Sequence, residues 1–235
     1  MNHVTMNPRL LNGLIVASAL LAIAAAPWAL DQSGLAFVFK PLTTVLILWR
    51  AWPRGADAPA ARRALRLGLL LSLLGDIALL WPQQGFLPGL VAFLFAHIAY
   101  IVAFTRQHRF LAQPAALTSY ALVASAILAL LWPSIPPGLR VPVACYVLAL
   151  TAMSAQTAVV GMAAQGQERQ RGRVLMLGGA LFMTSDALLA TNRFALPLPA
   201  ANLWILGSYW AAQWCIASWL KPAAADAAPA TPGAT

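Results

Sequence analysis

The chain has 235 residues, of which 61% are hydrophobic and only 9% are charged, and its mean hydropathy is +0.74. A chain of this composition has too few polar side chains to cover the surface of a soluble globule of the same length. These values argue against a soluble enzyme and indicate a membrane protein with several spans.

Eight apolar stretches are long enough to cross about 30 Å of hydrocarbon. In chain order they are residues 10–30, 35–52, 64–81, 86–105, 114–132, 140–162, 174–191 and 200–220. Segments rich in Pro, Gly, Gln and Asp separate them, as expected for turns. We therefore predict an all-α bundle of eight transmembrane helices in one domain, 1–221, followed by a disordered Ala/Pro-rich tail, 222–235.

The basic residues support this helix count and indicate an orientation. If the N-terminus is cytoplasmic, twelve of the fifteen Lys and Arg residues fall in cytoplasmic segments, Arg140 and Arg193 in outer loops, and Lys40 inside a span. This is the distribution that the positive-inside rule describes, so we expect both termini in the cytoplasm. The net charge of +9 is spread over short loops, which favours membrane lipids and not nucleic acid as partners.

The first apolar stretch has an alternative interpretation. Arg9, the apolar run that follows it and the three alanines at 24–26 imitate the three parts of a signal peptide. The run is longer than the apolar region of most signal peptides, so we prefer a membrane span. Cleavage of residues 1–26 stays an open alternative.

Two aspartates lie inside the apolar runs, Asp76 in LLLSLLGDIALLW and Asp186 in LGGALFMTSDALLA. A carboxylate at bilayer depth costs about 2.5–3.5 kcal/mol on insertion scales, so each needs a partner or takes part in chemistry. With a rise of about 1.5 Å per residue, both lie roughly 8 Å below the outer interface, and Lys40 lies at a similar depth. We predict that the two carboxyl groups converge on one lipid-accessible cavity.

Further polar side chains follow helical spacing in the same spans. His97 and Tyr100 are three residues apart and Tyr209 and Gln213 are four apart, so each pair shares a helical face. For His97 alone, an interhelical hydrogen bond is the simpler role, and both tyrosines suit packing equally well. Lys40 either extends to the outer headgroups or forms a buried ion pair.

Five short motifs follow one another along the spans. They are Lys40-Pro41-Leu42, Leu74-Gly75-Asp76, Ala96-His97 with Tyr100, Gly179-Ala180-Leu181-Phe182 leading to Ser185-Asp186, and Tyr209 with Gln213. Their order and spacing, from 35 to 220, resemble the YhhN family of lysoplasmalogenases. The resemblance implies hydrolysis of the vinyl ether bond of a lysophospholipid substrate to a fatty aldehyde and a glycerophospho-alcohol. It also implies location in a bacterial inner membrane.

The residues suit this chemistry. A vinyl ether is cleaved by protonation of its β-carbon, addition of water to the resulting cation and collapse of the hemiacetal. Like glycoside hydrolysis, this requires one carboxylic acid and one carboxylate. Two buried aspartates beside one lysine can hold these opposite protonation states. We expect Asp76 and Asp186 to be catalytic, with Asp76 nearer Lys40 because their spans are consecutive. Substrate-binding or orienting roles are expected for Lys40, His97, Tyr100, Ser185, Tyr209 and Gln213.

A metal-dependent mechanism is an alternative to this metal-free and cofactor-free chemistry. Asp76, His97 and Asp186 are side chains of the types that hold catalytic zinc. Only three histidines occur in the chain, and the other two lie outside the spans, so we prefer acid/base catalysis without a metal.

A transporter is the alternative function. Intramembrane Asp, Lys and His residues also form proton relays, and Asp76 and Asp186 are candidates for one in a proton-coupled transporter of small molecules or lipids. The segments GDIALL and SDALLA are followed 21 and 23 residues later by His97 and Tyr209, which suggests a parallel repeat. The sequence does not indicate an oligomeric state.

Overall fold

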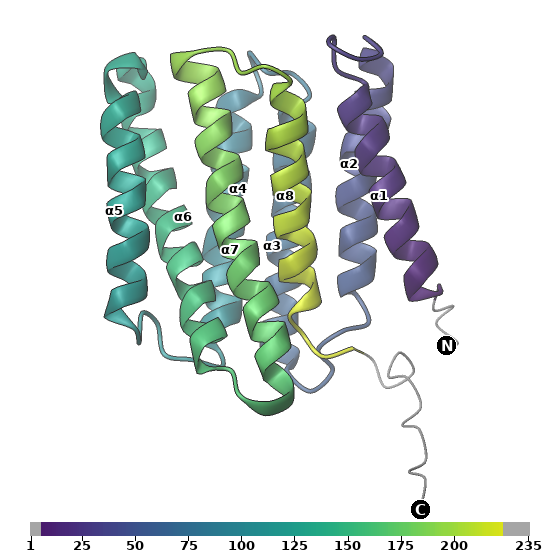
Figure 1. Cartoon of the computed structure of the whole chain (residues 1–235), viewed down its shortest axis with the longest axis vertical. Coiled ribbons are helices and arrows are strands. Elements are labelled where there is room, and N and C mark those ends of the chain that lie inside the picture. The colour runs from purple at the N-terminus through teal and green to yellow at the C-terminus, as the bar shows by residue number, and fades with distance from the viewer. Residues whose placement is uncertain (1–5, 223–235) are drawn as a thin grey trace, which may run out of the picture.

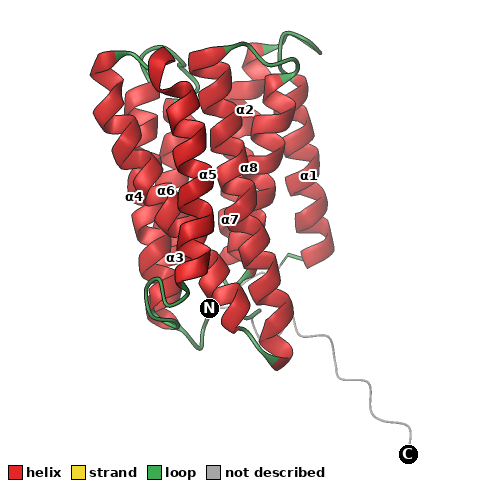
Figure 2. Cartoon of the chain, turned by 60° about the vertical axis from the view of Figure 1, so that its left-hand side comes forward, coloured by secondary structure: helices red, strands yellow, loops and turns green. Residues whose placement is uncertain are grey.

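The computed structural model describes residues 6–222, and within this range it contains eight α-helices and no strand (Figure 2). The helices are α1 (Pro8–Ala24), α2 (Ser33–Ala51), α3 (Pro59–Ala78), α4 (Phe86–Thr105), α5 (Pro114–Leu131), α6 (Pro137–Ala163), α7 (Arg169–Ala190) and α8 (Ala201–Ser218). The prediction of an all-α protein with eight helices is confirmed. The expected disordered tail, apart from Pro222, lies outside the described residues.

The helix boundaries differ from the predicted ones mainly at prolines. α1 ends at Ala24 and not near residue 30, because Pro27 disfavours a helical conformation for the residue before it. α3 begins at Pro59, five residues earlier than predicted, because proline is well suited to the first helical position, where its missing N–H is not needed. At the end of α7 a π-helical turn, Thr191–Ala195, continues the chain.

The composition and surface of the helices are those of an integral membrane protein. By length and apolarity alone, α2, α4, α5, α6 and α7 are each able to cross a membrane. Large apolar side chains point outward, and Leu130, Val141 and Leu148 are 80, 72 and 71% exposed. The polar side chains lie inside instead, among them Thr43, Thr44, Ser72, Asp76, His97 and Gln213. Lipid, and not water, suits such a surface.

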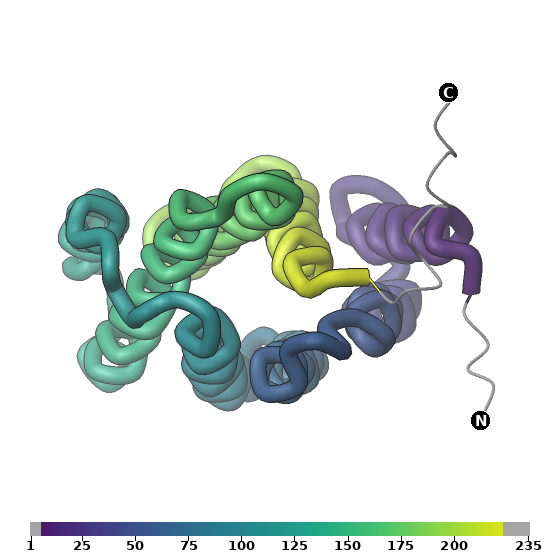
Figure 3. Tube along the Cα trace, turned by 90° about the horizontal axis from the view of Figure 1, so that it is seen from below, coloured from purple at the N-terminus to yellow at the C-terminus, as the bar shows by residue number. Residues whose placement is uncertain are grey.

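Six helices form a closed ring. α2 packs on α3, α3 on α4, α4 on α6, α6 on α7, α7 on α8, and α8 again on α2. Figure 3 shows the ring in cross-section, with α1 and α5 outside it on opposite sides. α1 packs on α2 and α8, and α5 packs mainly on α6. The start of α1 and the end of α8 lie at one end of the bundle, here called the base, and the opposite end is called the top (Figure 1).

Glycines allow α3 and α4 to approach closely. A Cβ atom added to Gly68 would lie 2.3 Å from a ring carbon of Tyr100, and one added to Gly75 would lie 2.5 Å from a ring carbon of Phe93. The two glycines are seven residues apart and therefore face α4 together. This contact fixes the positions of both aromatic rings next to Asp76.

The end of α8 is tied to the loop between α2 and α3 at the base. Gly55, which has a φ of +73°, donates a backbone hydrogen bond of 2.9 Å to the carbonyl of Lys221. The Lys221 ammonium lies 3.1 Å from Asp57 and 3.4 Å from Glu168, and these contacts raise the pKa of the lysine. Three segments that are distant in the sequence therefore meet at this corner.

Candidate active site

A cavity of about 460 Å³ lies near the top of the bundle, and its lining residues come from the ring helices and also from α1 and α5. Both predicted catalytic residues, Asp76 and Asp186, line it, together with Lys40, Tyr146 and Tyr209. The rest of the wall is largely apolar and includes Phe86, Leu90, Phe93, Leu128, Val143 and Val147. A volume of this size lies in the range of small-molecule sites, which is about 300–1,000 Å³.

Asp76 receives two hydrogen bonds on one carboxylate oxygen. The hydroxyl of Thr44 donates to Oδ2 over 2.6 Å, and the phenol of Tyr209 donates to the same atom over 2.7 Å. The indole of Trp210 in turn donates to the Thr44 hydroxyl over 3.2 Å. Asp76 itself is only 1% exposed. Hydrogen bonds of this kind stabilise the ionised form of a carboxyl group.

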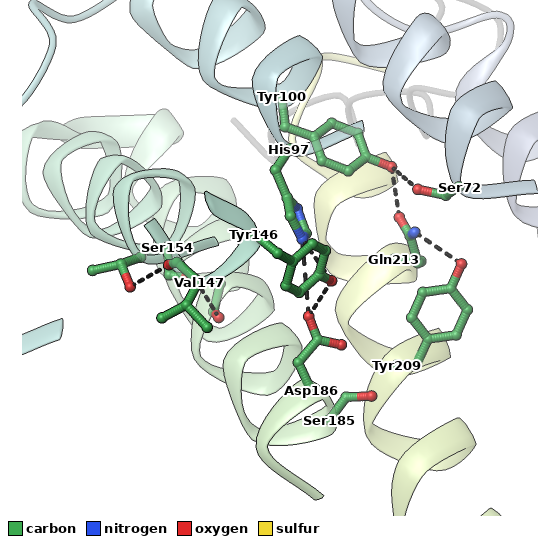
Figure 4. A network of polar contacts seen from close by, with 12 residues as sticks. Ser72, His97, Tyr100, Tyr146, Val147, Ser154, Ser185, Asp186, Tyr209 and Gln213 are labelled. Carbon is green, nitrogen blue, oxygen red and sulfur yellow. Dashed lines mark hydrogen bonds and ion pairs between the residues drawn. The ribbon is translucent and has the colours of Figure 1, made fainter. Parts of the chain in front are cut away.

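A second layer of polar side chains orients Tyr209. Gln213 donates to the Tyr209 hydroxyl over 3.2 Å, and Tyr100 donates to the amide oxygen of Gln213 over 2.7 Å (Figure 4). Ser72 lies 3.3 Å from the Tyr100 hydroxyl. Tyr100 and Gln213 do not line the cavity, so their contact with the site passes through Tyr209.

Asp186 belongs to a separate group of polar side chains that also reaches the cavity. Tyr146 donates to its Oδ2 atom over 2.5 Å, and His97 Nε2 lies 3.0 Å from the Tyr146 oxygen and 3.9 Å from Asp186 Oδ2 (Figure 4). Because the phenol has one hydrogen and gives it to Asp186, His97 is the donor to Tyr146. The Asp186 side chain keeps 13% of its surface exposed and is thus the more accessible carboxylate.

Aromatic rings separate the two polar groups. The ring of Phe182 lies 4.8 Å from that of His97 and 5.6 Å from that of Tyr209, measured between centroids. Phe93 packs edge-on against Tyr209 at 5.7 Å. This packing holds the two groups in separate, rigid positions around one cavity.

Lys40 and Ser185 are placed differently from the catalytic pair. Lys40 lines the cavity, but within the described part of the chain it forms neither an ion pair nor a hydrogen bond, and its charge acts on Asp76 only at longer range. The hydroxyl of Ser185 donates to the carbonyl of Ile205 over 2.9 Å and so ties α7 to α8. Lys40 therefore remains available to a ligand, whereas the hydroxyl of Ser185 is engaged in helix packing.

Tyr146 is the main member of the site that the sequence analysis missed. It lies on α6 with no charged residue near it in sequence, and its one visible signal is a tyrosine in the top half of a span. Arg193 also lines the cavity and was assigned only to a loop. The alternative zinc set does not converge, because among residues 6–222 no three His, Cys, Asp or Glu side chains lie close enough to hold one ion.

Comparison with known proteins agrees with the motifs. The YhhN family model matches residues 35–220. The chain is 36% identical to human lysoplasmalogenase TMEM86B over 166 residues, which are 71% of this chain and 65% of the human protein. It is 35% identical to the TMEM86B of Sus scrofa over 74% of this chain and 69% of that protein.

A bacterial relative is similar to the same degree. A lysoplasmalogenase of Mycobacterium bovis is 33% identical over 159 residues, which are 65% of this chain and 58% of that protein. The chain thus spans about two thirds of the length of the mammalian relatives named above and less of the mycobacterial one. No solved structure matches the chain. Because the family model covers most of the sequence, the chain belongs to the YhhN family.

Proposed function

We propose that this protein hydrolyses the vinyl ether bond of lysoplasmalogens and releases a fatty aldehyde and a glycerophospho-alcohol. The observation that carries the proposal is that Asp76 and Asp186 line one cavity, each within its own hydrogen-bonded group. The relatives support it, because several bear the name lysoplasmalogenase. The substrate is then a lysophospholipid taken from the surrounding membrane.

The shape and depth of the cavity suit such a lipid. Most of its lining side chains are apolar, which suits a single hydrocarbon chain, and its polar lining residues include both aspartates, Lys40 and Arg193. Asp76 lies five residues before Trp81, an exposed residue at the top, and is therefore roughly 8 Å below it along α3. The vinyl ether of a lysolipid lies just beneath its headgroup, at a comparable depth.

The hydrogen bonds suggest which aspartate has which role. Asp76 accepts hydrogen bonds from the hydroxyls of Thr44 and Tyr209, and because such bonds stabilise a carboxylate, Asp76 is assigned the ionised form in this proposal. Asp186 accepts from Tyr146 alone and has a second carboxyl oxygen to carry a proton. Asp186 is therefore the general acid in this proposal, and Asp76 is the carboxylate that stabilises the cation formed from the vinyl ether.

The proton transfers balance over one cycle. Asp186 protonates the β-carbon of the vinyl ether and leaves an oxocarbenium ion, which the Asp76 carboxylate stabilises. Asp76 then takes a proton from the water that adds to the α-carbon, giving a hemiacetal. As the hemiacetal collapses, its hydroxyl proton returns to Asp186 and the proton on Asp76 passes to the leaving oxygen. The aldehyde and the alcohol form, and both carboxyl groups regain their starting states.

The basic residues support one orientation of the protein in its membrane. Twelve of the fifteen basic residues lie on segments at the base of the bundle, which supports a cytoplasmic base and cytoplasmic termini. The cavity then faces the outer leaflet. For the host bilayer we propose the inner membrane of a bacterium, as the family resemblance implies.

The test uses detergent-solubilised protein and a panel of lysolipids that differ only in a vinyl ether, alkyl ether or ester linkage. Aldehyde release is expected from the vinyl ether alone. The variants Asp76→Asn and Asp186→Asn are each expected to lose about 10²- to 10⁴-fold in kcat, since this is the usual contribution of a general acid or base. Asp31→Asn, in the exposed loop between α1 and α2, is the matched control. Full activity of both folded variants would reject the assignment.

The transporter alternative has less support, because the named relatives are hydrolases. The same assay separates the two functions. A transporter requires sealed vesicles and a gradient, whereas an enzyme turns over in detergent micelles. Solubilised protein that releases no aldehyde from any of the lipids, yet moves protons in vesicles, would favour the transporter.

A further inference from the structure

Two cationic side chains share the cavity with the two aspartates. Lys40 on α2 and Arg193 on the π-helical turn after α7 are the only basic residues in the cavity wall. They come from opposite parts of the sequence. Within residues 6–222 neither forms a direct ion pair with a carboxylate, and Lys40 interacts with Asp76 only at longer range.

Arg193 is held by an aromatic ring in a way that leaves its hydrogen-bond donors available. Its guanidinium carbon lies 5.0 Å from the centroid of Phe86, the first residue of α4. A guanidinium group is planar, so when one face stacks on a ring its N–H groups still point outward in the plane of the group. There they can donate hydrogen bonds to a phosphate or a carboxylate. π-Helical turns often occur at functional sites, and this one places Arg193 beside the cavity.

Lys40 lies deeper, among apolar side chains of the same wall. Helical side chains lean toward the N-terminus of their helix, which for α2 is the top of the bundle, the end at which the Arg193 turn also lies. An ammonium without a direct ionic partner at this depth is unfavourable, and a bound anion would offset that cost. Asp76 acts on Lys40 only at longer range, and neither Asp76 nor Asp186 forms a direct ion pair with it.

Asn192 adds a neutral donor to the two cations. It precedes Arg193 and also lines the cavity. Its amide oxygen accepts a hydrogen bond of 2.9 Å from the backbone N–H of Leu198, so its amide nitrogen is the part left for a ligand. Lys40, Arg193 and Asn192 together present hydrogen-bond donors and two positive charges, which is the donor set of a phosphate site.

We propose that Lys40 and Arg193 form a phosphate subsite that selects phosphorylated lysolipids over neutral glycerol ethers. This subsite deepens the proposed function and rests on it for the identity of the lipid. In a lysoplasmalogen, the phosphate and the vinyl ether are attached to opposite ends of one glycerol unit. In the proposed arrangement the phosphate binds to Lys40 and Arg193, and the vinyl ether lies at the aspartates. The subsite therefore sets the depth at which the scissile bond stops.

Binding of lipids that cannot be hydrolysed tests the subsite without turnover. The probes are a long-chain 1-O-alkyl glycerophosphoethanolamine and the 1-O-alkyl glycerol of the same chain length, titrated against detergent-solubilised protein by tryptophan fluorescence. The wild type is expected to bind the phosphorylated probe about 10- to 100-fold more tightly, the range expected for charge-assisted hydrogen bonds. Arg193→Gln and Lys40→Met should each remove most of that preference and leave the affinity for the alkyl glycerol within about twofold.

Arg140→Gln is the matched control, because Arg140 also lies near the top and stacks on a ring, that of Trp132, but does not line the cavity. It should keep the preference of the wild type. Equal affinity of the wild type for both probes, or an equal loss of both in the variants, would overturn the subsite. Competition by inorganic phosphate alone would also overturn it, because the site would then serve free phosphate and not a lipid headgroup.

The binding preference between the two probes is measured without catalysis, so it tests the subsite separately from the proposed hydrolysis. A wild-type protein that prefers the phosphorylated probe but releases no aldehyde from lysoplasmalogen would disprove the proposed hydrolysis and leave the subsite standing. A protein that hydrolyses lysoplasmalogen but shows no preference between the probes would disprove only the subsite.

Discussion

Tyr209 on α8 donates a hydrogen bond of 2.7 Å to Asp76 on α3, which lies 133 positions earlier in the chain. Asp186 on α7 shows the reciprocal arrangement, since it lies 3.9 Å from His97 on α4. The aspartate of the α3–α4 hairpin thus lies next to a tyrosine of the α7–α8 hairpin, and the aspartate of the α7–α8 hairpin lies near a histidine of the α3–α4 hairpin. The two hairpins depend on each other for the geometry of the site.

The two donors to Asp76 are expected to act as one unit. Thr44→Val and Tyr209→Phe each remove one hydrogen bond to the same carboxylate oxygen. Each change should lower kcat about 10- to 100-fold, because hydrogen bonds to charged groups contribute about 1.5–3 kcal/mol. The double variant should deviate from the product of the two single effects. A double-mutant cycle on aldehyde release measures this deviation, and strictly independent effects would show that the hydroxyls do not act through one carboxylate.

Removal of the Tyr146 hydroxyl should impair the Asp186 group. Tyr146→Phe leaves the ring in place but breaks the contacts of the phenol with Asp186 and His97. We expect kcat to fall about 10- to 100-fold with little change in KM, because the acid loses its orientation and not its substrate. Tyr120→Phe on α5 is the control, since the Tyr120 hydroxyl forms no hydrogen bond with residues 6–222 and Tyr120 does not line the cavity. Equal activity of the two variants would remove Tyr146 from the mechanism.

The close contact between α3 and α4 predicts a strong effect of one methyl group. Gly68→Ala forces the Tyr100 ring to move, because the added Cβ would lie 2.3 Å from it. Overpacking of this kind typically costs about 1–3 kcal/mol, and it should also loosen the Gln213 contact that orients Tyr209. A lower melting temperature and lower kcat are expected. Gly207→Ala on α8 has open space at its Cβ and should be neutral or slightly stabilising.

At the base of the bundle, the backbone conformation of Gly55 should contribute more to thermal stability than the exposed ion pairs of Lys221. Gly55→Ala places a side chain at a φ of +73°, which costs about 1–2 kcal/mol. Lys221→Gln removes two solvent-exposed ion pairs and should leave the melting temperature nearly unchanged. Thermal melts of the two variants in the same detergent compare these effects. A larger loss in Lys221→Gln would contradict this ranking.

The same lysine gives an expectation for pH. A group whose pKa is raised by folding contributes stability below its unfolded pKa and loses it only as the pH rises through the folded value. Because the pKa of Lys221 is raised above the usual lysine range, its pairs with Asp57 and Glu168 should persist between about pH 6 and 9. The difference in melting temperature between the wild type and Lys221→Gln should therefore stay constant over this range.

Local features were predictable from the sequence because they depend on neighbouring residues. Apolar run length predicted the eight helices, and the cost of burying Asp76 and Asp186 singled out two residues that line the cavity. The ring order was not predictable. α4 packs on α6 and leaves α5 outside, although α5 lies between them in the chain. Tyr146 was missed for this reason, since its role depends on α6 lying between α4 and α7.

Aromatic side chains fill the ring below the two carboxylates. Tyr100 and Phe104 stack with centroids 6.2 Å apart, and Phe104 packs edge-on against Trp219 at 5.1 Å. These rings separate the cavity from the base of the bundle. In a protein with the proposed activity, both halves of a cleaved lipid would leave at the leaflet from which the lipid came. The aldehyde would stay in the hydrocarbon and the alcohol would enter the adjoining water, so that neither product crosses the bilayer.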